Sequence, residues 1–161
     1  MKALFTYGLF ELNKRIRYNE DTIIRLANRG KMNQMKNIVL AGDYGYIRQI
    51  ETTIKSLCCY HEGLLIYVFN QDIPQEWFIN TRKKVKGTGN DLLDIKLLRD
   101  DLRMKWEEST YSHINYMAYA RYFIPEYVKA DRALYLDCDL VVTQNLDHLF
   151  DLNLKITILQ Q

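Results

Sequence analysis

Apolar positions along the chain follow two spacings, one typical of buried strands and one typical of helices. Continuous apolar runs predict strands at 38–41, 64–69, 92–97 and 133–136. Between them, apolar spacing by three and four, a proline at a helix start and a serine N-cap predict helices at 47–58, 74–85 and 112–124. A further apolar run, 140–142, follows the last strand, and we expect Pro125 to end the last helix.

The alternation of strands with helices predicts an α/β fold, with a mostly parallel sheet flanked by helices. In sheets of this kind, ligands bind beyond the carboxyl ends of the strands. Asp43 follows the first predicted strand, and the segment 137–139 follows the last. We therefore expect Asp43 and the aspartates of that segment to share one site.

The first 34 residues differ in character from the rest, and we interpret 1–34 as an N-terminal extension. Apolar residues between 10 and 29 can be placed on one helical face, which predicts a basic amphipathic helix that stops at Gly30. Seven Lys or Arg against three Asp or Glu give this extension a net charge of +4, whereas the whole chain carries +2. The basic residues are too dispersed to predict nucleic-acid binding.

Composition narrows the class of protein further. With 161 residues, 48% of them apolar and 26% charged, the chain suits one globular domain and not a disordered or low-complexity protein. Its apolar runs are shorter than the ~18 residues that a transmembrane segment needs. We therefore predict a cytoplasmic protein without a transmembrane segment, with peripheral contact at the inner face of the membrane as the alternative. Three cysteines, two of them adjacent, make no disulfide framework and are predicted to be buried thiols.

Two aspartates separated by one residue, Asp137 and Asp139, are the strongest candidates for chemistry. They lie between apolar runs, and an extended segment would place both carboxylates on one side and Cys138 on the other. Two carboxylates this close repel each other unless a cation neutralises them. Their oxygen atoms suit Mg²⁺ or Mn²⁺, which complete their shell with water and phosphate. The alternative is a pair of solvated turn aspartates.

Three motifs, in order, resemble those of glycosyltransferase family 8. Residues 37–46 are similar to the family's first strand and its A-x-D-x-x-Y nucleotide-binding turn. Residues 119–121 resemble its Y-A-R helix. Residues 135–142 and 146–150 resemble its metal-binding segment, so the resemblance covers most of 36–154.

This resemblance implies a Rossmann-like GT-A nucleotide-diphosphosugar transferase fold, with residues 35–154 as its nucleotide-sugar-binding part. It implies a hexosyltransferase that transfers glucose or galactose from UDP-glucose or UDP-galactose with retention at the anomeric carbon. The implied acceptor is a glycan, a lipid-linked acceptor or a protein. The implied cofactor is a divalent cation, Mn²⁺ or Mg²⁺.

The resemblance also implies roles for the residues of the first motif. Asp43 would accept a hydrogen bond from the uracil edge, Tyr46 would stack on the base and Ala41 would pack nearby. Ile114 lies where the family's helix approaches the nucleotide. Without the other two motifs, the favoured interpretation is a turn aspartate or N-cap for Asp43 and a surface aromatic for Tyr46.

For the later motifs, the resemblance implies contacts with the diphosphate and the sugar. Asp137 and Asp139 would hold the metal, and Asp137 would also contact the nucleotide. Arg121 would lie beside the donor sugar and its phosphate, where a planar cation can clamp oxygen atoms. The metal would stabilise the charge of the departing UDP.

The chain also departs from the family's pattern at its carboxyl end. The family's late H-x-x-G-x-x-K-P-W segment, whose His completes the metal site, has no counterpart among the three histidines, His61, His113 and His148. We expect a domain that is incomplete at the C-terminus, with 155–161 as an aberrant tail that one lost nucleotide would explain. A non-catalytic remnant that keeps partial UDP and metal binding is therefore an alternative function.

A third class is a phosphatase of the haloacid dehalogenase type. Residues 137–142 fit its D-x-D-x-[TV]-[LV] motif, in which the first aspartate is a nucleophile. That family needs later Ser/Thr, Lys and acidic motifs, and only 24 residues follow Asp137. The phosphatase is therefore the least favoured of the three functions.

Overall fold

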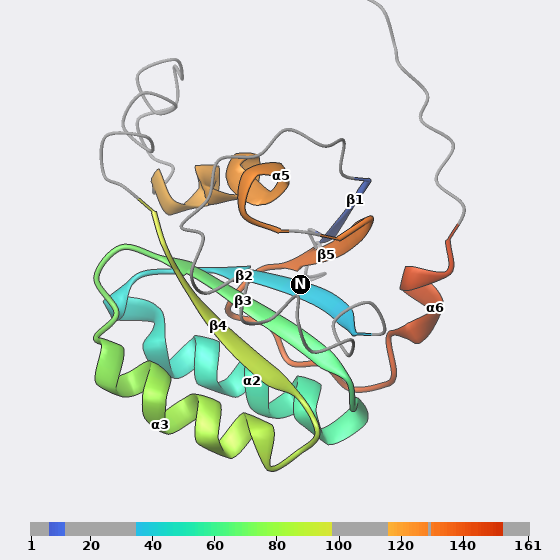
Figure 1. Ribbon diagram of the computed structural model, residues 1–161, viewed down its shortest axis with the longest axis horizontal. Helices are drawn as coiled ribbons and strands as arrows, with labels where there is room; N and C mark the ends of the chain where they lie inside the picture. Colours follow the sequence, from blue (N-terminus) through green and yellow to red (C-terminus); the bar gives the residue numbers. More distant parts are fainter. Residues whose placement is uncertain (1–6, 12–34, 98–115, 129, 153–161) are drawn as a thin grey trace, which may run out of the picture.

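A five-stranded sheet forms the centre of the computed structural model, which describes residues 7–11, 35–97, 116–128 and 130–152 (Figure 1). Its strands, in chain order, are β1 (Tyr7–Glu11), β2 (Lys36–Ala41), β3 (Leu64–Asn70), β4 (Asp91–Lys96) and β5 (Arg132–Leu136). Their order across the sheet is β1-β5-β2-β3-β4. β5, β2, β3 and β4 run parallel, and β1 pairs antiparallel with β5.

Helices cover both faces of this sheet. α2 (Ile47–Tyr60) and α3 (Gln75–Lys86) lie on one face, and α5 (Ile124–Tyr127) lies on the other (Figure 1). Two 3₁₀ segments, η2 (Tyr44–Tyr46) and η3 (Tyr116–Phe123), precede α2 and α5, and the short α6 (Asp147–Phe150) follows β5. Among the residues described, no helix is both long enough and apolar enough to cross a bilayer.

Alternate side chains of each central strand supply the two cores. In β2, Ile38 and Leu40 pack with apolar residues of α2 and α3, whereas Val39 and Ala41 pack with residues of η3 and α5. Every residue of β3 is buried. Burial on both faces explains why the parallel strands read as continuous apolar runs, and each buried Leu or Ile contributes about 1.5–3 kcal/mol.

The order of the strands reverses direction at one point. The chain runs outward from β2 through α2, β3 and α3 to β4, and then returns to place β5 on the opposite side of β2. Loops that leave the carboxyl ends of β2 and β5 therefore diverge and leave a crevice between them. This topological switch point is where open α/β sheets bind their ligands.

The segment Tyr7–Glu11 corrects the prediction of a helix from residue 10. It pairs with β5 along its whole length, Tyr7 opposite Leu136 and Glu11 opposite Arg132. Pairing with the otherwise open edge of β5 outweighs the local apolar spacing at these positions. The rest of the predicted helix, 12–29, lies outside the described residues.

The prediction that Pro125 ends the last helix is wrong. Pro125 occupies the first turn of α5, which continues to Tyr127. A proline is tolerated there because the first amides of a helix have no partner within the helix. The start of the predicted helix, at Ser112, lies outside the described residues.

Two further expectations differ from the structure. The apolar run 140–142 forms no strand, and Cys138 and Asp139 form a turn instead of an extended segment. Of the three thiols predicted to be buried, Cys138 is buried, Cys58 is half-buried and Cys59 is exposed. Leu57 lies on the buried side of α2. Cys59, two residues further along the helix, lies on the side that faces solvent.

Candidate functional site

An open cleft of about 220 Å³ lies at the switch point between β2 and β5. It is bounded by the ends of these two strands, by the η2 turn and by η3. The residues that line it are Ala41, Gly42, Tyr46, Met117, Ala118, Arg121, Tyr135, Asp137, Cys138 and Asp139. The cleft thus joins parts of the sequence that are far apart in the chain.

The turn after β2 is held by hydrogen bonds at three successive residues. The Gly42 amide donates to the carbonyl oxygen of Phe69 (3.1 Å), and the Tyr44 amide donates to Oδ1 of Asp72 (2.7 Å). Asp43 caps the turn, and its Oδ1 accepts from the amide of Gly45 (3.0 Å). Tyr46 remains 40% exposed beside the cleft, so its ring can stack on a planar ligand.

Gly42 allows the turn after β2 to approach the turn after β5. A Cβ atom at this position would lie 3.0 Å from Cδ1 of Ile50 and 3.2 Å from Sγ of Cys138. Both distances are shorter than ordinary van der Waals contact. A larger residue would therefore force these side chains to shift by a few tenths of an ångström, so glycine favours the close approach of the two turns beside the cleft.

Asp137 and Asp139 flank a thiol that stays protonated. Burial, together with the negative charges of Asp139, Asp137 and Asp43, raises the pKa of Cys138 to about 12. All three carboxylates thus act on the same thiol, although Asp43 is far from the other two in sequence. A thiol with this pKa is a poor nucleophile and packs instead with the core.

Arg121 supplies a positive charge to the cleft. Its guanidinium lies 5.0 Å from the centre of the Tyr135 ring, and its Nε donates to the carbonyl oxygen of Ala118 (2.9 Å). Burial raises the pKa of Tyr135 to about 12, while the nearby Arg121 opposes this shift. The cation–π contact and the hydrogen bond hold the guanidinium in one place, where it can meet an anionic ligand.

The donor set of the cleft fits a divalent cation that is shared with a ligand. Two carboxylates, Asp137 and Asp139, line one open space, and their hard oxygen atoms suit Mg²⁺ or Mn²⁺. The described residues contain no group of three or more His, Cys, Asp or Glu side chains that could hold a metal ion. A cation held by Asp137 and Asp139 alone would therefore need water and phosphate oxygens to complete its coordination shell.

Comparison with known proteins identifies the family. The sequence profile of glycosyl transferase family 8 matches residues 37–160. The chain belongs to glycosyl transferase family 8. The match includes the whole cleft and most of the 155–161 tail.

Several curated relatives of this family 8 chain come from Streptococcus pneumoniae. Glycosyltransferase GlyE is 52% identical over 122 residues, which cover 76% of this chain and 30% of GlyE. Glycosyltransferase GlyA is 36% identical over 151 residues, which cover 93% of this chain and 20% of GlyA. The chain thus spans less than a third of the length of these two relatives.

Solved structures confirm the predicted GT-A fold. The apo form of GlyE from S. pneumoniae superposes with a TM-score of 0.61 at 47% identity, covering 75% of this chain and 27% of GlyE. The active-site mutant Q189E of LgtC superposes with a TM-score of 0.62 at 25% identity, covering 73% of this chain and 42% of LgtC. Family membership also decides against the phosphatase alternative.

The structure brings most of the predicted site residues of this family 8 chain to one cleft. Five of them line it: Ala41, Tyr46, Arg121, Asp137 and Asp139. Asp43 lies in the adjoining turn, and Ile114 lies outside the described residues. The roles that the resemblance implies for these side chains stay predictions.

The remaining lining residues could not all be predicted from the sequence. Gly42 could have been found, because a glycine between a buried strand and a turn often marks a close backbone approach. Tyr135 lies within a motif, but nothing local shows that its ring meets Arg121. Met117 and Ala118 contribute through the packing of η3 on the sheet, which only the tertiary structure shows.

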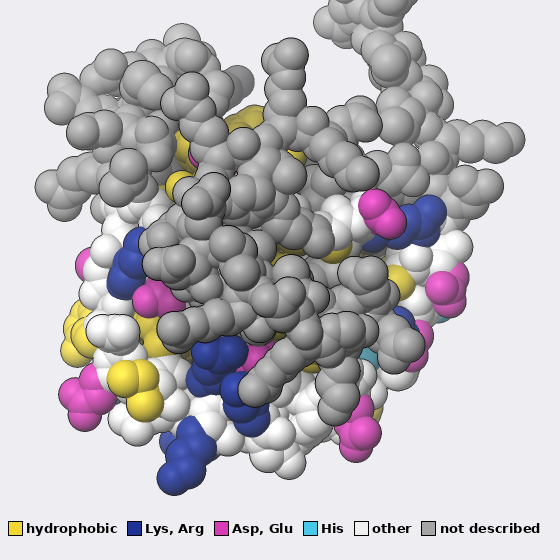
Figure 2. Space-filling model, viewed as in Figure 1, with side chains coloured by type: hydrophobic (Ala, Val, Ile, Leu, Met, Phe, Trp, Pro, Cys, Tyr) yellow, Lys and Arg dark blue, Asp and Glu magenta, His cyan; other side chains and the backbone are white. Residues whose placement is uncertain are grey.

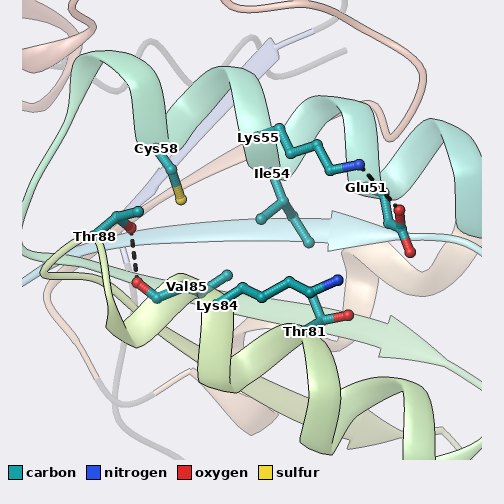
Figure 3. A pocket seen from close by; sticks show the side chains of 8 residues that line it. All are labelled: Glu51, Ile54, Lys55, Cys58, Thr81, Lys84, Val85 and Thr88. Carbon is teal, nitrogen blue, oxygen red and sulfur yellow. Dashed lines mark hydrogen bonds and ion pairs between the residues drawn. The ribbon is translucent and has the colours of Figure 1, made fainter.

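A second, smaller pocket of about 100 Å³ lies between α2 and α3 (Figure 3). Its apolar wall includes Ile54 and Val85, and its rim carries the Lys55–Glu51 ion pair and Lys84. This pocket contains none of the predicted site residues.

Figure 2 shows further Lys and Arg side chains over α3. The last turn of this helix is basic, which complements the helix dipole.

Proposed function

We propose that this chain forms the donor-binding part of a family 8 hexosyltransferase. In this proposal, the cleft binds the nucleotide and diphosphate of a UDP-sugar, and the hexose is transferred with retention at the anomeric carbon. The observation that carries the proposal is the convergence of Tyr46, Arg121 and the Asp137–Asp139 pair on one cleft at the switch point of the sheet.

The nucleotide would bind against the turn after β2. Tyr46 offers a half-exposed ring for the base, and Ala41 is small enough to let the base approach the end of β2. A carboxylate at Asp43 suits the imide N–H of uracil, which cytosine lacks. These features favour UDP over CDP.

The diphosphate would lie between Arg121 and the two aspartates. Arg121 would bind phosphate oxygens, since a planar guanidinium presents several donors at once. Asp137 and Asp139 would hold Mn²⁺ or Mg²⁺ on the other side. When bound, such a cation supplies Lewis-acid stabilisation of the negative charge on the UDP leaving group.

A fold neighbour supports the hexose as the transferred group. The galactosyltransferase LgtC has been crystallised in complex with donor and acceptor sugar analogs, and it superposes with a TM-score of 0.61 at 24% identity. By analogy, we propose UDP-glucose or UDP-galactose as the donor and a glycan, a lipid-linked acceptor or a protein as the acceptor. The cytoplasm, including the inner face of the membrane, is the proposed location because nucleotide sugars would be available there.

A nucleotide panel tests the proposed function. Calorimetric titration of the 161-residue chain with UDP, CDP and GDP in the presence of Mn²⁺ should give the strongest binding for UDP. UDP-glucose and UDP-galactose are then compared for binding, hydrolysis and transfer. Binding of a UDP-sugar without turnover would support the remnant alternative, and no binding of any of the three diphosphates would contradict the proposal.

A further inference from the structure

The backbone that carries the two aspartates is held by buried side chains of α2. The Thr53 hydroxyl donates to the carbonyl oxygens of Cys138 (2.9 Å) and Leu140 (2.7 Å). One turn further along α2, Oγ of Ser56 accepts from the amide of Val142 (2.9 Å). Residues 138–142 lie outside the sheet, so these bonds replace the ladder that would fix a strand.

A third side chain of the same helix end fixes the following residues. Nε2 of His61 accepts from the amide of Leu146 (2.8 Å), and Nδ1 of the ring lies 3.0 Å from the carbonyl oxygen of Leu57. Because Nε2 accepts, the proton is on Nδ1, which donates to Leu57. The ring is therefore anchored to α2 on one side and to the segment after Val142 on the other.

These polar groups interrupt the apolar face of α2. Thr53 is fully buried, and Ser56 and His61 are 9% and 6% exposed, among buried neighbours such as Ile54 and Leu57. A valine or an alanine would fill the same space without a hydroxyl group to satisfy. Burying a hydroxyl group is unfavourable unless it is hydrogen-bonded, so packing alone does not explain these residues.

Thr53 bonds to the residues on either side of Asp139. Its single hydroxyl proton is shared between the carbonyl oxygens of residues 138 and 140, so the peptide group that precedes Asp139 and the peptide group that follows Leu140 are both oriented from α2. Holding the backbone on both sides of Asp139 limits the directions in which its carboxylate can leave the backbone. Groups that orient a metal ligand in this way affect metal affinity although they do not touch the ion.

The same helix also carries the nucleotide turn. α2 begins at Ile47, directly after the η2 turn that ends at Tyr46. One rigid element therefore holds the turn after β2 at its start and the turn after β5 along its buried face. The distance between the two halves of the cleft is set by α2.

We propose that Thr53 and Ser56 are positioning residues for Asp139, which together hold the Asp137–Asp139 turn in the geometry that binds a divalent cation. This inference rests on the proposed function of the cleft. Neither residue contacts the ligand, and each acts through the backbone of residues 138–142. His61 extends the same arrangement to Leu146.

Three substitutions on α2 test this inference. Thr53→Val removes the hydroxyl group at constant shape, and Thr53→Ser restores it. Thr52→Val is the matched control, because Thr52 is the adjacent, exposed residue and its hydroxyl donates to Arg48 within the same helix (2.9 Å). The first readout is the affinity for Mn²⁺ in the presence of UDP, measured by calorimetry, and the second is amide hydrogen exchange of residues 138–142 without ligand.

Thr53→Val should weaken Mn²⁺ binding by at least about 10-fold and accelerate exchange in 138–142, as expected for loss of an orienting group. Thr53→Ser should recover most of both losses, and Thr52→Val should change neither. If Thr53→Val does not fold, Ser56→Ala takes its place, with faster exchange of the Val142 amide as the specific sign.

The failures are distinguishable. Wild-type protein that binds no Mn²⁺ with UDP would contradict the proposed function, while the exchange data would still decide whether α2 orders the turn. Wild-type binding that Thr53→Val and Ser56→Ala leave unchanged would overturn the positioning role alone. An equal loss in Thr52→Val would overturn it as well, since the effect would then belong to the helix as a whole.

Discussion

At the residue scale, the turn after β2 presents a carboxylate and an aromatic ring in fixed positions. Asp43 caps the turn through Gly45, and Asp72 holds the amide of Tyr44 from the end of β3. A base that stacks on Tyr46 would therefore meet an anionic acceptor at its edge. In the proposed function, specificity for uracil over cytosine would depend on this pairing of one acceptor with one N–H donor.

We expect Asp43→Asn to reduce the preference for UDP over CDP. An amide side chain can both donate and accept, so it no longer selects for the imide N–H of uracil. The capping bond to Gly45 can survive, because asparagine keeps an oxygen acceptor. Calorimetric titration of wild type and Asp43→Asn with UDP and CDP measures the ratio of affinities, and an unchanged ratio would contradict the role assigned to Asp43.

Gly42 is the residue whose replacement should disturb the cleft through space alone. We expect Gly42→Ala to lower the free energy of unfolding by about 1–3 kcal/mol, because the added methyl group overlaps Ile50 and Cys138. Urea unfolding measures this loss. The double variant Gly42→Ala with Ile50→Val removes the nearest contacting atom and should recover part of the stability; no recovery would show that another contact limits the space.

At the element scale, the four parallel strands were predictable, and the antiparallel edge strand β1 was not. β2 and β3 are buried on both faces, so their own sequences contain continuous apolar runs. β1 forms only because β5 offers an open edge, and that information lies more than a hundred residues away in the chain. The irregular path of 140–142 depends in the same way on Thr53 and Ser56 of α2.

One ion pair joins α3 to β4 and should make stability depend on pH. Nε and a terminal nitrogen of Arg82 donate to the two carboxylate oxygens of Asp91 (2.6 and 2.9 Å). Burial raises the pKa of Asp91, but the bonds from Arg82 and the Leu92 amide outweigh it, so the pKa lies below the ordinary value. A lowered carboxyl pKa stabilises the folded state above the unfolded-state value of about 4, and this contribution is lost as the pH falls through the folded-state pKa.

Asp91→Asn should therefore lower the free energy of unfolding by about 1 kcal/mol at pH 7, and by less as the pH falls below about 4, since the pair is partly exposed to solvent. Asp94→Asn in the same strand is the control. Burial raises the pKa of Asp94, so its charge opposes folding at neutral pH and the substitution should not destabilise. Chemical denaturation at several pH values measures the change in the free energy of unfolding for both variants. A loss for Asp91→Asn that does not depend on pH would contradict the role of its ion pair with Arg82.

At the scale of the whole molecule, the site results from the order of the strands. The alternation of strands and helices predicted that Asp43 and the Asp137–Asp139 pair share a site, because both follow strands of one parallel sheet. Which side of β2 receives β5 is decided by long-range packing, and the position of the crevice follows from it. The contribution of η3 to the cleft, through Arg121, depends on the same packing.

The share of the relatives' length that this chain covers bears on what the whole molecule can do. The chain aligns with less than a third of GlyE, and the family match over residues 37–160 contains the cleft. We therefore propose donor binding for the residues described and leave acceptor recognition to the transfer experiments. In this proposal, Asp137 and Asp139 bind a divalent cation together with UDP.

A binding cycle with and without metal tests this proposal. UDP is titrated into wild type, Asp139→Ala and Asp131→Ala, each with and without Mn²⁺; Asp131 is an exposed aspartate at the opposite end of β5 and serves as the control. We predict that Mn²⁺ strengthens UDP binding at least about 10-fold in wild type and Asp131→Ala and has no effect in Asp139→Ala, whose fold is verified by circular dichroism. Equal strengthening by Mn²⁺ in wild type and Asp139→Ala would contradict the proposal.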